Sequence, residues 1–449
     1  MPSAASEASL CIQSEKRQSN VSATTKYRDN ADLVLAKTLD VHVSEENLYE
    51  QIWSIVNTLC PFLDENDSIS DNDDPTMPVS TSHKVAMMIN TSALTIKPLT
   101  GGLSNELFIV RTSHPQGVLV RIHPSIGGDL LIDREKENKL VAWLSSQGIG
   151  PTYYGRFTNG RVEEFYPNVT PLSCHEMAQF APQIASHMAD FHNLRAPNNI
   201  LPKPNCLENS SHFVAIDAWF AAVFNRLGQS TEGVNGEEKD EIKLSQEMHK
   251  EWMWVKDCLG ENGSKEVIND RSPVKCKALK FIREMVLTHQ DCQSLNILKD
   301  TSVPSSESIK HDIKLIDFEY SGWNPRAADI ANTFCEHCDM NNLCARYENE
   351  YPSEHDQNVF LKAYVARADP ILAAGHLNTG DHSNVDPKTE EEFLSTLRHE
   401  IARFTLLSHV GWAVWAVLKN LEDSGIDFDY LEYARHRMDG YKLFKSLYC

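Results

Sequence analysis

The pattern of hydrophobic residues changes once along this chain, and that change limits the folds that it can adopt. Short apolar stretches at residues 95–99, 106–112 and 117–123, separated by turn residues, predict strands of one small sheet, with further short strands within 150–165. The spacing at residues 133–146 predicts one helix in this region. After Pro171 the spacing is mainly helical, with helices expected at 177–194, 217–227, 243–259, 274–285, 354–366 and 390–421. The sequence therefore predicts an α+β fold with a small mixed-sheet lobe, which carries one helix, and a larger helical lobe.

The segments outside this pattern suggest the domain organisation. Residues 1–43 are rich in Ser, Ala and Thr and lack a sustained apolar period, so we expect a flexible leader. A helix is predicted at residues 47–63, after Ser44 as its cap. Residues 64–74 hold six acids and no base, which favours a solvated loop, and the Gly- and acid-rich residues 228–241 favour another. We expect a leader at 1–43, a first lobe at 44–165 with the acidic loop 64–74, and a second lobe at 166–449.

The charge of the chain limits the classes of partner that it can bind. The 449 residues include 63 acidic and 42 basic ones, a formal net charge of −21, which argues against nucleic acid or an anionic membrane surface and favours a cationic ligand. Residues 1–20 lack the apolar segment of a secretory signal. No run reaches the length of about 20 apolar residues that a membrane span needs; polar residues interrupt the nearest run, 404–418. Because the eleven cysteines are irregularly spaced, we expect a reducing, cytoplasmic setting.

The segment around residue 290 has the pattern of a phosphoryl-transfer centre. His289, Asp291 and Asn296 form an H-x-D-x-x-x-x-N arrangement, and an apolar strand ending in Asp317 follows after a polar break. Phosphoryl transfer needs a carboxylate that accepts a hydroxyl proton, and a carboxylate and an amide oxygen that hold magnesium against the phosphates. We predict that Asp291 is the base and that Asn296 and Asp317 are the metal ligands. The alternative is that these residues only cap and turn the chain.

Two upstream features fit a nucleotide site. Gly101 and Gly102 lie between two strands, where their backbone N–H groups can contact phosphate oxygens, although such a pair can also be a plain turn. Arg121 lies among apolar neighbours in the strand that follows, and Glu137 lies in the next helix. This order is typical of a kinase small lobe, in which a strand cation contacts the phosphates and a helix carboxylate orients it. Arg replaces the usual Lys, and a guanidinium binds phosphate at least as well.

From about Thr95 to its end, the chain resembles the choline/ethanolamine kinase family. The matching strings are TGGLSN, DREKENKLVAWLSSQGIGP, NGRVEEF, HQDCQSLNIL, LIDFEYSGWNPRAADIANTFCE, GWAVW and DYLEYARHR. The resemblance implies a protein-kinase-like two-lobed fold, ATP and magnesium as cofactors, a small amino alcohol as substrate, and a homodimer. The nucleotide site that it implies comprises Thr100, Gly101, Gly102, Leu103, Ser104, Asn105, Glu106, Arg121, Glu137, Glu164, Gln293 and Asp317.

The acceptor site follows from chemistry and from the same resemblance. A quaternary ammonium cannot donate a hydrogen bond, so aromatic faces and nearby carboxylates hold it best. Trp412 and Trp415 lie three residues apart, on one face of a predicted helix, although such a pair can also fill a core. The resemblance adds Glu319, Tyr320, Glu336 and Tyr433 to this site, beside Asp291.

Some residues depart from the family pattern. Gln290 and His337 stand where the family usually has Asn and Trp, and CDMNN at residues 338–342 replaces a Tyr-rich run. Cys335, Cys338 and Cys344 lie close together, but no second C-x-x-C pair completes a zinc pattern.

We predict a choline kinase, which makes phosphocholine in the first step of the CDP-choline route to phosphatidylcholine. An ethanolamine kinase, or a kinase of both substrates, is the alternative. An aminoglycoside-type phosphotransferase and a non-catalytic regulatory relative are more distant alternatives, since the first would not be expected to carry GWAVW and the second would lose Asn296 and Asp317.

Overall fold

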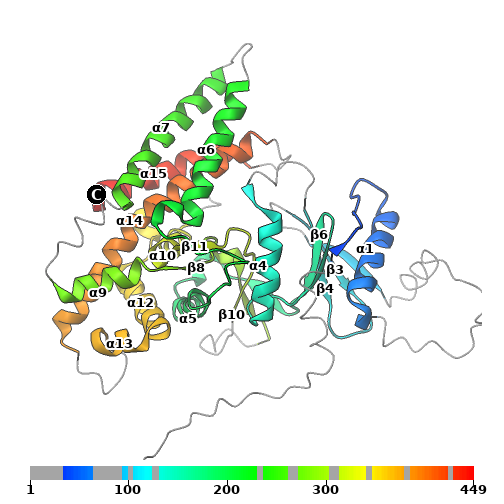
Figure 1. Ribbon diagram of the computed structural model, residues 1–449, viewed down its shortest axis with the longest axis horizontal. Coiled ribbons are helices and arrows are strands. Elements are labelled where there is room, and N and C mark those ends of the chain that lie inside the picture. The colour runs from blue at the N-terminus through cyan, green and yellow to red at the C-terminus, as the bar shows by residue number, and fades with distance from the viewer. Residues whose placement is uncertain are drawn as a thin grey trace, which may run out of the picture.

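The computed structural model describes residues 34–63, 94–99, 105–123, 131–229, 236–260, 272–302, 313–339, 346–378, 385–422 and 428–449. A lobe built on one sheet lies beside a larger lobe of helices (Figure 1). This arrangement is the two-lobed α+β fold that the change of hydrophobic pattern predicts. The acidic segment 64–74 and the hairpin residues 100–104 lie outside the described residues.

The first lobe is a six-stranded sheet with the strand order β1-β5-β6-β4-β3-β2. Its strands are β1 (Val34–Leu35), β2 (Thr95–Leu99), β3 (Glu106–Arg111), β4 (Val118–Ile122), β5 (Tyr153–Phe157) and β6 (Gly160–Glu164). All neighbours pair antiparallel except β1 and β5. Helix α1 (Glu45–Leu59) packs on the sheet through Ile52, Trp53 and Val56, and α4 (Arg134–Ser146) lies on the side toward the helical lobe (Figure 1). The strands predicted before residue 123 and the helix predicted at 133–146 are confirmed.

The ordered sheet begins inside the segment that we expected to be a leader. Val34 and Leu35 pair in parallel with Arg156 and Phe157 of β5. Further along, the Asn159 side chain accepts from the Leu39 N–H and donates to the Leu39 carbonyl, both at 2.9 Å, and Leu39 is buried. These long-range hydrogen bonds hold residues 34–39 on the sheet, so the expectation of a leader is wrong for this part.

The second lobe is mainly helical. Its helices are α5 (Ala181–His192), α6 (Ser211–Gln229), α7 (Gly236–Leu259), α9 (Pro273–Ile282), α10 (Arg326–Cys335), α11 (Tyr347–Glu350), α12 (Glu354–Ala368), α13 (Pro370–His376), α14 (Pro387–Asn420) and α15 (Tyr430–Tyr448). Helix α14 lies in the centre and packs against α6, α7, α9, α10 and α15. By length and composition α14 could span a membrane, but 94% of its most apolar 18-residue window is buried inside the lobe, as in the core helix of a globular domain.

Short strands carry the chain between these helices. They are β7 (Val169–Pro171), β8 (Met285–Thr288), β9 (Ile297–Asp300), β10 (Ile313–Leu315) and β11 (Gly322–Pro325). Strand β9 pairs with β7 and β10, and β8 pairs with β11, in each case antiparallel. The apolar strand predicted before Asp317 is confirmed as β10, which pairs with β9.

The structure differs from the predicted helices in several places. The predicted loop at 228–241 is wrong at its end, because α7 begins at Gly236; its first turns hold Glu, Lys and Asp, which carry no apolar period although Glu and Lys favour helix. The helix predicted at 274–285 ends at Ile282, and Met285 begins β8. Helix α10 was not predicted, because all its residues are buried and it therefore lacks a polar face.

Candidate active site

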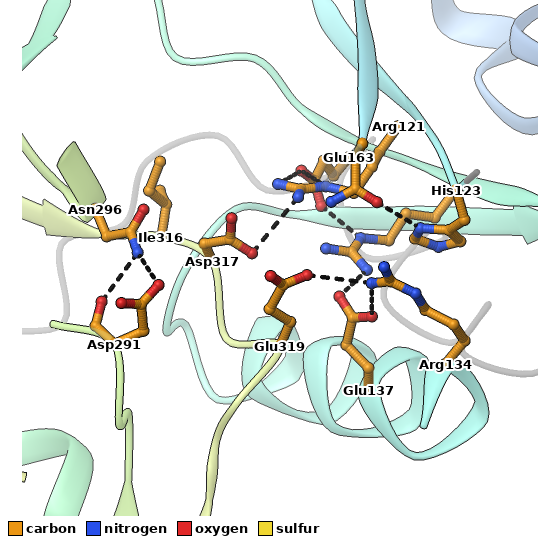
Figure 2. Close-up of polar contacts among 12 residues, drawn as sticks. Arg121, His123, Arg134, Glu137, Glu163, Asp291, Asn296, Ile316, Asp317 and Glu319 are labelled. Atoms are coloured by element: carbon orange, nitrogen blue, oxygen red, sulfur yellow. Dashed lines mark hydrogen bonds and ion pairs between the residues drawn. The ribbon is translucent and has the colours of Figure 1, made fainter. Parts of the chain in front are cut away.

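The loop after β8 brings Asp291 and Asn296 together. Asn296 lies in the short 3-10 turn η5 (Ser294–Asn296), and its Nδ2 donates to the Asp291 carbonyl at 2.9 Å and to Asp291 Oδ2 at 2.7 Å (Figure 2). The amide nitrogen of Asn296 is thereby used to hold the carboxylate of Asp291. Its Oδ1 remains as an oxygen ligand of the kind that a hard cation prefers.

A buried acid that sequence reasoning missed holds this loop in place. Asp329, in the first turn of α10, accepts from the backbone N–H groups of His289 at 2.8 Å and Gln290 at 2.7 Å. His192 Nε2 lies 2.8 Å from the same carboxylate, and its Nδ1 lies 2.5 Å from the Tyr364 hydroxyl. Burial alone would raise the pKa of Asp329, but the interactions with His192 and His289 together outweigh it, so the pKa is lowered. An Asp flanked by Ala and Ile, in the string AADIANTF, was the signal that could have identified it.

Asp317 follows β10 in a conformation that side chains rarely adopt. Its φ is 66°, in the left-handed region, as is that of Gln290. Such backbone strain in residues other than glycine is concentrated at functional sites. The Asp317 carboxylate faces the other lobe, where Arg121 Nη1 on β4 donates to its Oδ1 at 3.5 Å (Figure 2). This ion pair joins the two lobes across the centre of the site.

The structure corrects the expected pairing of Arg121 with Glu137. Strand register places Arg121 opposite Arg161 on β6, and Glu163, also on β6, contacts both, at 3.3 Å from Arg121 Nη2 and 2.8 Å from Arg161 Nε. Glu137 instead binds Arg161 Nη1 at 2.5 Å and Arg134 Nη1 at 2.8 Å. Two neighbouring arginines on one face repel each other, and these two carboxylates offset that repulsion. Glu163 therefore orients Arg121, and Glu137 acts only indirectly, through its contact with Arg161.

Arg134 extends this chain of charges to Glu319. Its Nη1 donates to Glu319 Oε2 at 3.2 Å, and Figure 2 shows the carboxylates of Glu319 and Asp317 on the same side of the arginines. Burial raises the pKa of Glu319 to about 7, with Asp317 contributing. Burial raises the pKa of Asp291 as well, with Glu336 and Asp317 adding to the effect. Clustered carboxyl groups of this kind favour the binding of cations.

A cavity of about 720 Å³ runs between the lobes. Most of the candidate residues line it, namely Asn105, Arg121, Glu164, Asp291, Gln293, Asn296, Asp317, Glu319, Tyr320, Glu336, Trp412, Trp415 and Tyr433. Glu106 and Glu137 are candidates within the described residues that do not line it. Thr100, Gly101, Gly102, Leu103 and Ser104 lie outside the described residues, as does Cys344.

The first-lobe side of the cavity suits a flat apolar group. Leu107, Leu119 and Phe165 of the first lobe, together with Leu298 and Ile316 of the second, contribute its apolar lining. Glu164 lies at the end of β6, and its Oε2 accepts from the Thr152 N–H at 3.0 Å and from the Thr152 hydroxyl at 2.7 Å. Asn105 Oδ1 lies 2.9 Å from His123 Nδ1 where the hairpin enters β3.

The other end of the cavity is lined by aromatic rings. The ring centroids of Tyr320 and Trp412 are 5.2 Å apart, those of Trp412 and Trp415 are 5.5 Å apart, and those of Trp415 and Tyr430 are 5.9 Å apart. Trp415 Nε1 donates to the Tyr320 hydroxyl at 2.9 Å, which fixes both rings. Phe428 and Tyr430 also line this end and were missed. Phe428 comes just before the string DYLEYARHR, and Tyr430 lies within that string but was not singled out.

The carboxylate at this aromatic end already has a cationic partner. Arg437 Nη2, from α15, donates to Glu336 Oε1 at 2.5 Å, and Arg437 Nε donates to the Tyr433 hydroxyl at 2.9 Å. Sequence reasoning named Glu336 and Tyr433 but missed Arg437, although it lies in the string DYLEYARHR. The ion pair neutralises much of the charge that Glu336 would offer to a ligand.

The oxygen atoms at the centre fit a hard divalent cation. Asn296 supplies an amide oxygen and Asp317 a carboxylate, and magnesium commonly binds through one or two protein ligands together with waters and phosphates. In the described part of the chain, no three His, Cys, Asp or Glu side chains form a metal-binding group of their own.

The two lobes, with this cluster in the cleft between them, define a phosphotransferase of the protein-kinase-like class. The solved structure of Plasmodium vivax ethanolamine kinase has the same fold, with a TM-score of 0.60 and 20% identity over 92% of this chain and 99% of that one. A model of the choline/ethanolamine kinase family matches residues 96–442. The chain belongs to this family, and membership implies the use of ATP.

Curated relatives carry both substrate names. Probable choline kinase 2 of Arabidopsis thaliana is 29% identical over 373 residues, which are 80% of this chain and 87% of that protein. Ethanolamine kinase 1 of Mus musculus is 30% identical over 353 residues, which are 78% of this chain and 83% of that protein. The similarity is thus nearly equal for the two substrates, and the choice between them depends on the site.

Proposed function

We propose that this protein transfers the γ-phosphoryl group of ATP to choline, giving phosphocholine and ADP, in the first step of the CDP-choline route to phosphatidylcholine. The observation that carries the proposal is the aromatic end of the cavity, which opens onto Asp291. Ethanolamine is the alternative acceptor, and use of both substrates is a further one.

In this mechanism the residues of the chain position the reactants and move one proton. Choline would lie with its ammonium among Tyr320, Trp412 and Trp415, so that its hydroxyl points toward Asp291. The hydroxyl oxygen attacks the γ-phosphorus, the bond to ADP breaks, and Asp291 takes the hydroxyl proton. Asn296 and Asp317 would hold magnesium, which supplies charge neutralisation at the phosphates. Arg121, held by Glu163, would contact the same phosphates.

The surroundings of the ammonium favour choline over ethanolamine. Aromatic faces attract a methylated ammonium, and a desolvated contact of this kind contributes about 2 kcal/mol. Ethanolamine keeps N–H groups that need acceptors, and the nearest acid at the aromatic end, Glu336, is already paired with Arg437. Glu319 lies further in and is paired with Arg134, so we expect weaker use of ethanolamine rather than its exclusion.

A parallel assay with choline and ethanolamine on Trp415 variants tests this proposal. For Trp415→Leu we expect kcat/KM for choline to fall by up to about 30-fold, which is the loss of about 2 kcal/mol, and kcat/KM for ethanolamine to fall less. Trp415→Phe, which keeps a ring but loses the hydrogen bond to Tyr320, is the matched control and should lose less choline activity than Trp415→Leu. Equal losses for both acceptors, or a wild-type protein that prefers ethanolamine, would contradict the assignment.

We further propose that the protein works in the cytoplasm as a homodimer that binds neither nucleic acid nor membrane. The net charge of −21 and the buried position of α14 support the absence of such partners. Sedimentation of the purified chain tests the oligomeric state.

The aminoglycoside-type alternative is disfavoured by the aromatic end of the cavity, since an aminoglycoside is large and carries many N–H donors. The non-catalytic alternative is disfavoured because Asp291, Asn296 and Asp317 lie together.

A further inference from the structure

Two cysteines that are distant in sequence meet at the outer end of the helical lobe. Cys258 lies in the last turn of α7 and Cys449 lies at the end of α15, and their sulfur atoms are 3.9 Å apart. Figure 1 shows the end of α15, marked C, beside the end of α7. Both cysteines are thiols; Cys449 is exposed and Cys258 is partly exposed. A small reagent in solvent can therefore reach the pair, which lies outside the cavity described above.

Helix α14 places a cation beside this pair. Arg403 Nη2 donates to Cys258 Sγ at 3.3 Å and to the Cys258 carbonyl at 2.8 Å, while its Nη1 binds Glu400 Oε2 at 3.2 Å. Glu400 is buried and also binds Arg283 at 2.6 Å, so the guanidinium is held against the sulfur. A fixed cation in contact with a sulfur atom stabilises the thiolate.

The two thiols differ in acidity as a result. Hydrogen bonding with Cys449, together with Arg403, lowers the pKa of Cys258 to about 6. The same hydrogen bond, together with burial, raises the pKa of Cys449. At neutral pH Cys258 is mainly a thiolate, the reactive form, whereas Cys449 keeps its proton.

We propose that Cys258 and Cys449 form an oxidation site for hydrogen peroxide, in which Cys258 attacks the peroxide and Cys449 resolves the product to a disulfide. The Cys258 sulfur bonds to one peroxide oxygen, the O–O bond breaks, and hydroxide leaves, so Cys258 becomes a sulfenic acid. The Cys449 sulfur then attacks the Cys258 sulfur, the S–O bond breaks, and the oxygen leaves as water. Two thiols lose two electrons in total, and one peroxide is reduced to two waters. A dithiol reductant reverses the reaction.

The position of the pair makes closure feasible. The sulfur atoms must approach from 3.9 Å to about 2.05 Å. Cys449 is exposed, and its backbone is tied to α15 by the hydrogen bond from its N–H to the Lys445 carbonyl at 3.1 Å. The resulting bond would join α7 to α15, across a sequence separation of 191 residues. A crosslink over so long a segment restricts the unfolded chain, so the oxidised protein should unfold at a higher temperature than the reduced one.

Peptide mapping of the full chain after treatment with hydrogen peroxide tests the proposal. We expect a peptide crosslinked between residues 258 and 449 within one chain, together with a higher Tm that a dithiol returns to its starting value. Cys449→Ser should stop oxidation at the sulfenic acid of Cys258, which dimedone labels, and Cys258→Ser should abolish both products. Cys276, an exposed cysteine on α9, is the internal control and should react more slowly.

The role of Arg403 is tested by the pH dependence of the oxidation rate. In the wild type the rate should level off above about pH 7, because Cys258 is already ionised. In Arg403→Met it should continue to rise toward the ordinary thiol pKa of about 8.5. Arg398→Met is the matched control, since Arg398 lies on the same helix and binds Glu391. The proposal is overturned if Cys258 is oxidised no faster than Cys276, or if the crosslink joins two chains.

Discussion

Asp291 lies where an acceptor hydroxyl and a phosphate would meet, and its carboxylate is held by Asn296 rather than by a cation. Asp291→Asn keeps the size of the side chain and an oxygen that can accept from Asn296, but it cannot take a proton. We expect turnover to fall by about 10²-fold or more, while ATP affinity, measured by calorimetry, stays near the wild-type value.

The matched control for this variant is Asp300→Asn. Asp300 lies at the end of the neighbouring strand β9, where it accepts from the Ser302 N–H at 2.7 Å, outside the cavity. Its turnover should match that of the wild type. Near-normal turnover of Asp291→Asn would mean that Asp291 is not the base.

A test of Asp317 needs a substitution that is compatible with the left-handed backbone conformation of this residue. Its φ of 66° is tolerated by Asn and resisted by Ala, so Asp317→Asn removes the charge with little added strain. We expect the magnesium concentration needed for half-maximal rate to rise steeply and the maximal rate to fall by at least about 10²-fold, because the loss of one preorganised charge at a transition state has effects of this size. Initial rates over a magnesium titration provide the measurement. An unchanged magnesium dependence would assign Asp317 a structural role alone.

At the scale of elements, the loop that carries Asp291 and Asn296 depends on the junction of β8 with α10. The two N–H groups of His289 and Gln290 are both satisfied by the single carboxylate of Asp329, which is fully buried. Asp329→Asn leaves one oxygen for the two N–H groups and removes the charge beside His192. We expect a loss of unfolding free energy on the order of 3 kcal/mol, measured in urea, and a fall in kcat that exceeds the change in KM.

Tyr364→Phe provides the comparison for that variant. Tyr364 lies one step further out, between His192 and Arg326. The Tyr364→Phe variant should lose unfolding free energy but keep a larger share of kcat than Asp329→Asn, because Asp329 still holds the loop. If the two variants lose kcat in the same proportion, the network stabilises the lobe without positioning the loop.

At the scale of the whole molecule, buried histidines should make the protein sensitive to acid. Burial lowers the pKa of His212, and that of the half-buried His337, to about 4, and it lowers the pKa of His409 further. In the unfolded chain each has a pKa near 6.5, so below that pH the unfolded state binds more protons, and stability falls as the pH falls. Each such histidine should contribute about 1.4 kcal/mol per pH unit between about pH 6.5 and 4.

Urea unfolding at a series of pH values between 7.5 and about 4.5 measures this slope. His337→Phe should show a smaller slope than the wild type by about one proton, since the phenyl ring has no group to titrate. If the slope is equal in the two proteins, groups other than His337 cause the acid sensitivity.

Local sequence was sufficient to predict the features that depend only on residues close together in the chain. The strands β2, β3 and β4, the helix α4 and the succession of a sheet lobe and a helical lobe follow from hydrophobic period, which acts over a few residues. Asp291 and Asn296 are five residues apart, so one tight loop brings them together, and the motif carries its own geometry.

Only the tertiary structure decided which partners those residues have. Arg121 binds Glu163 rather than Glu137 because strand register, not sequence order, sets which side chains share a face. Arg437 neutralises Glu336, and Asp329 holds the loop that carries Asp291, because α15 and α10 pack there. The contact of Cys258 with Cys449 spans 191 residues. Such contacts depend on how whole elements dock, and docking is driven by apolar burial that no short stretch of sequence reveals.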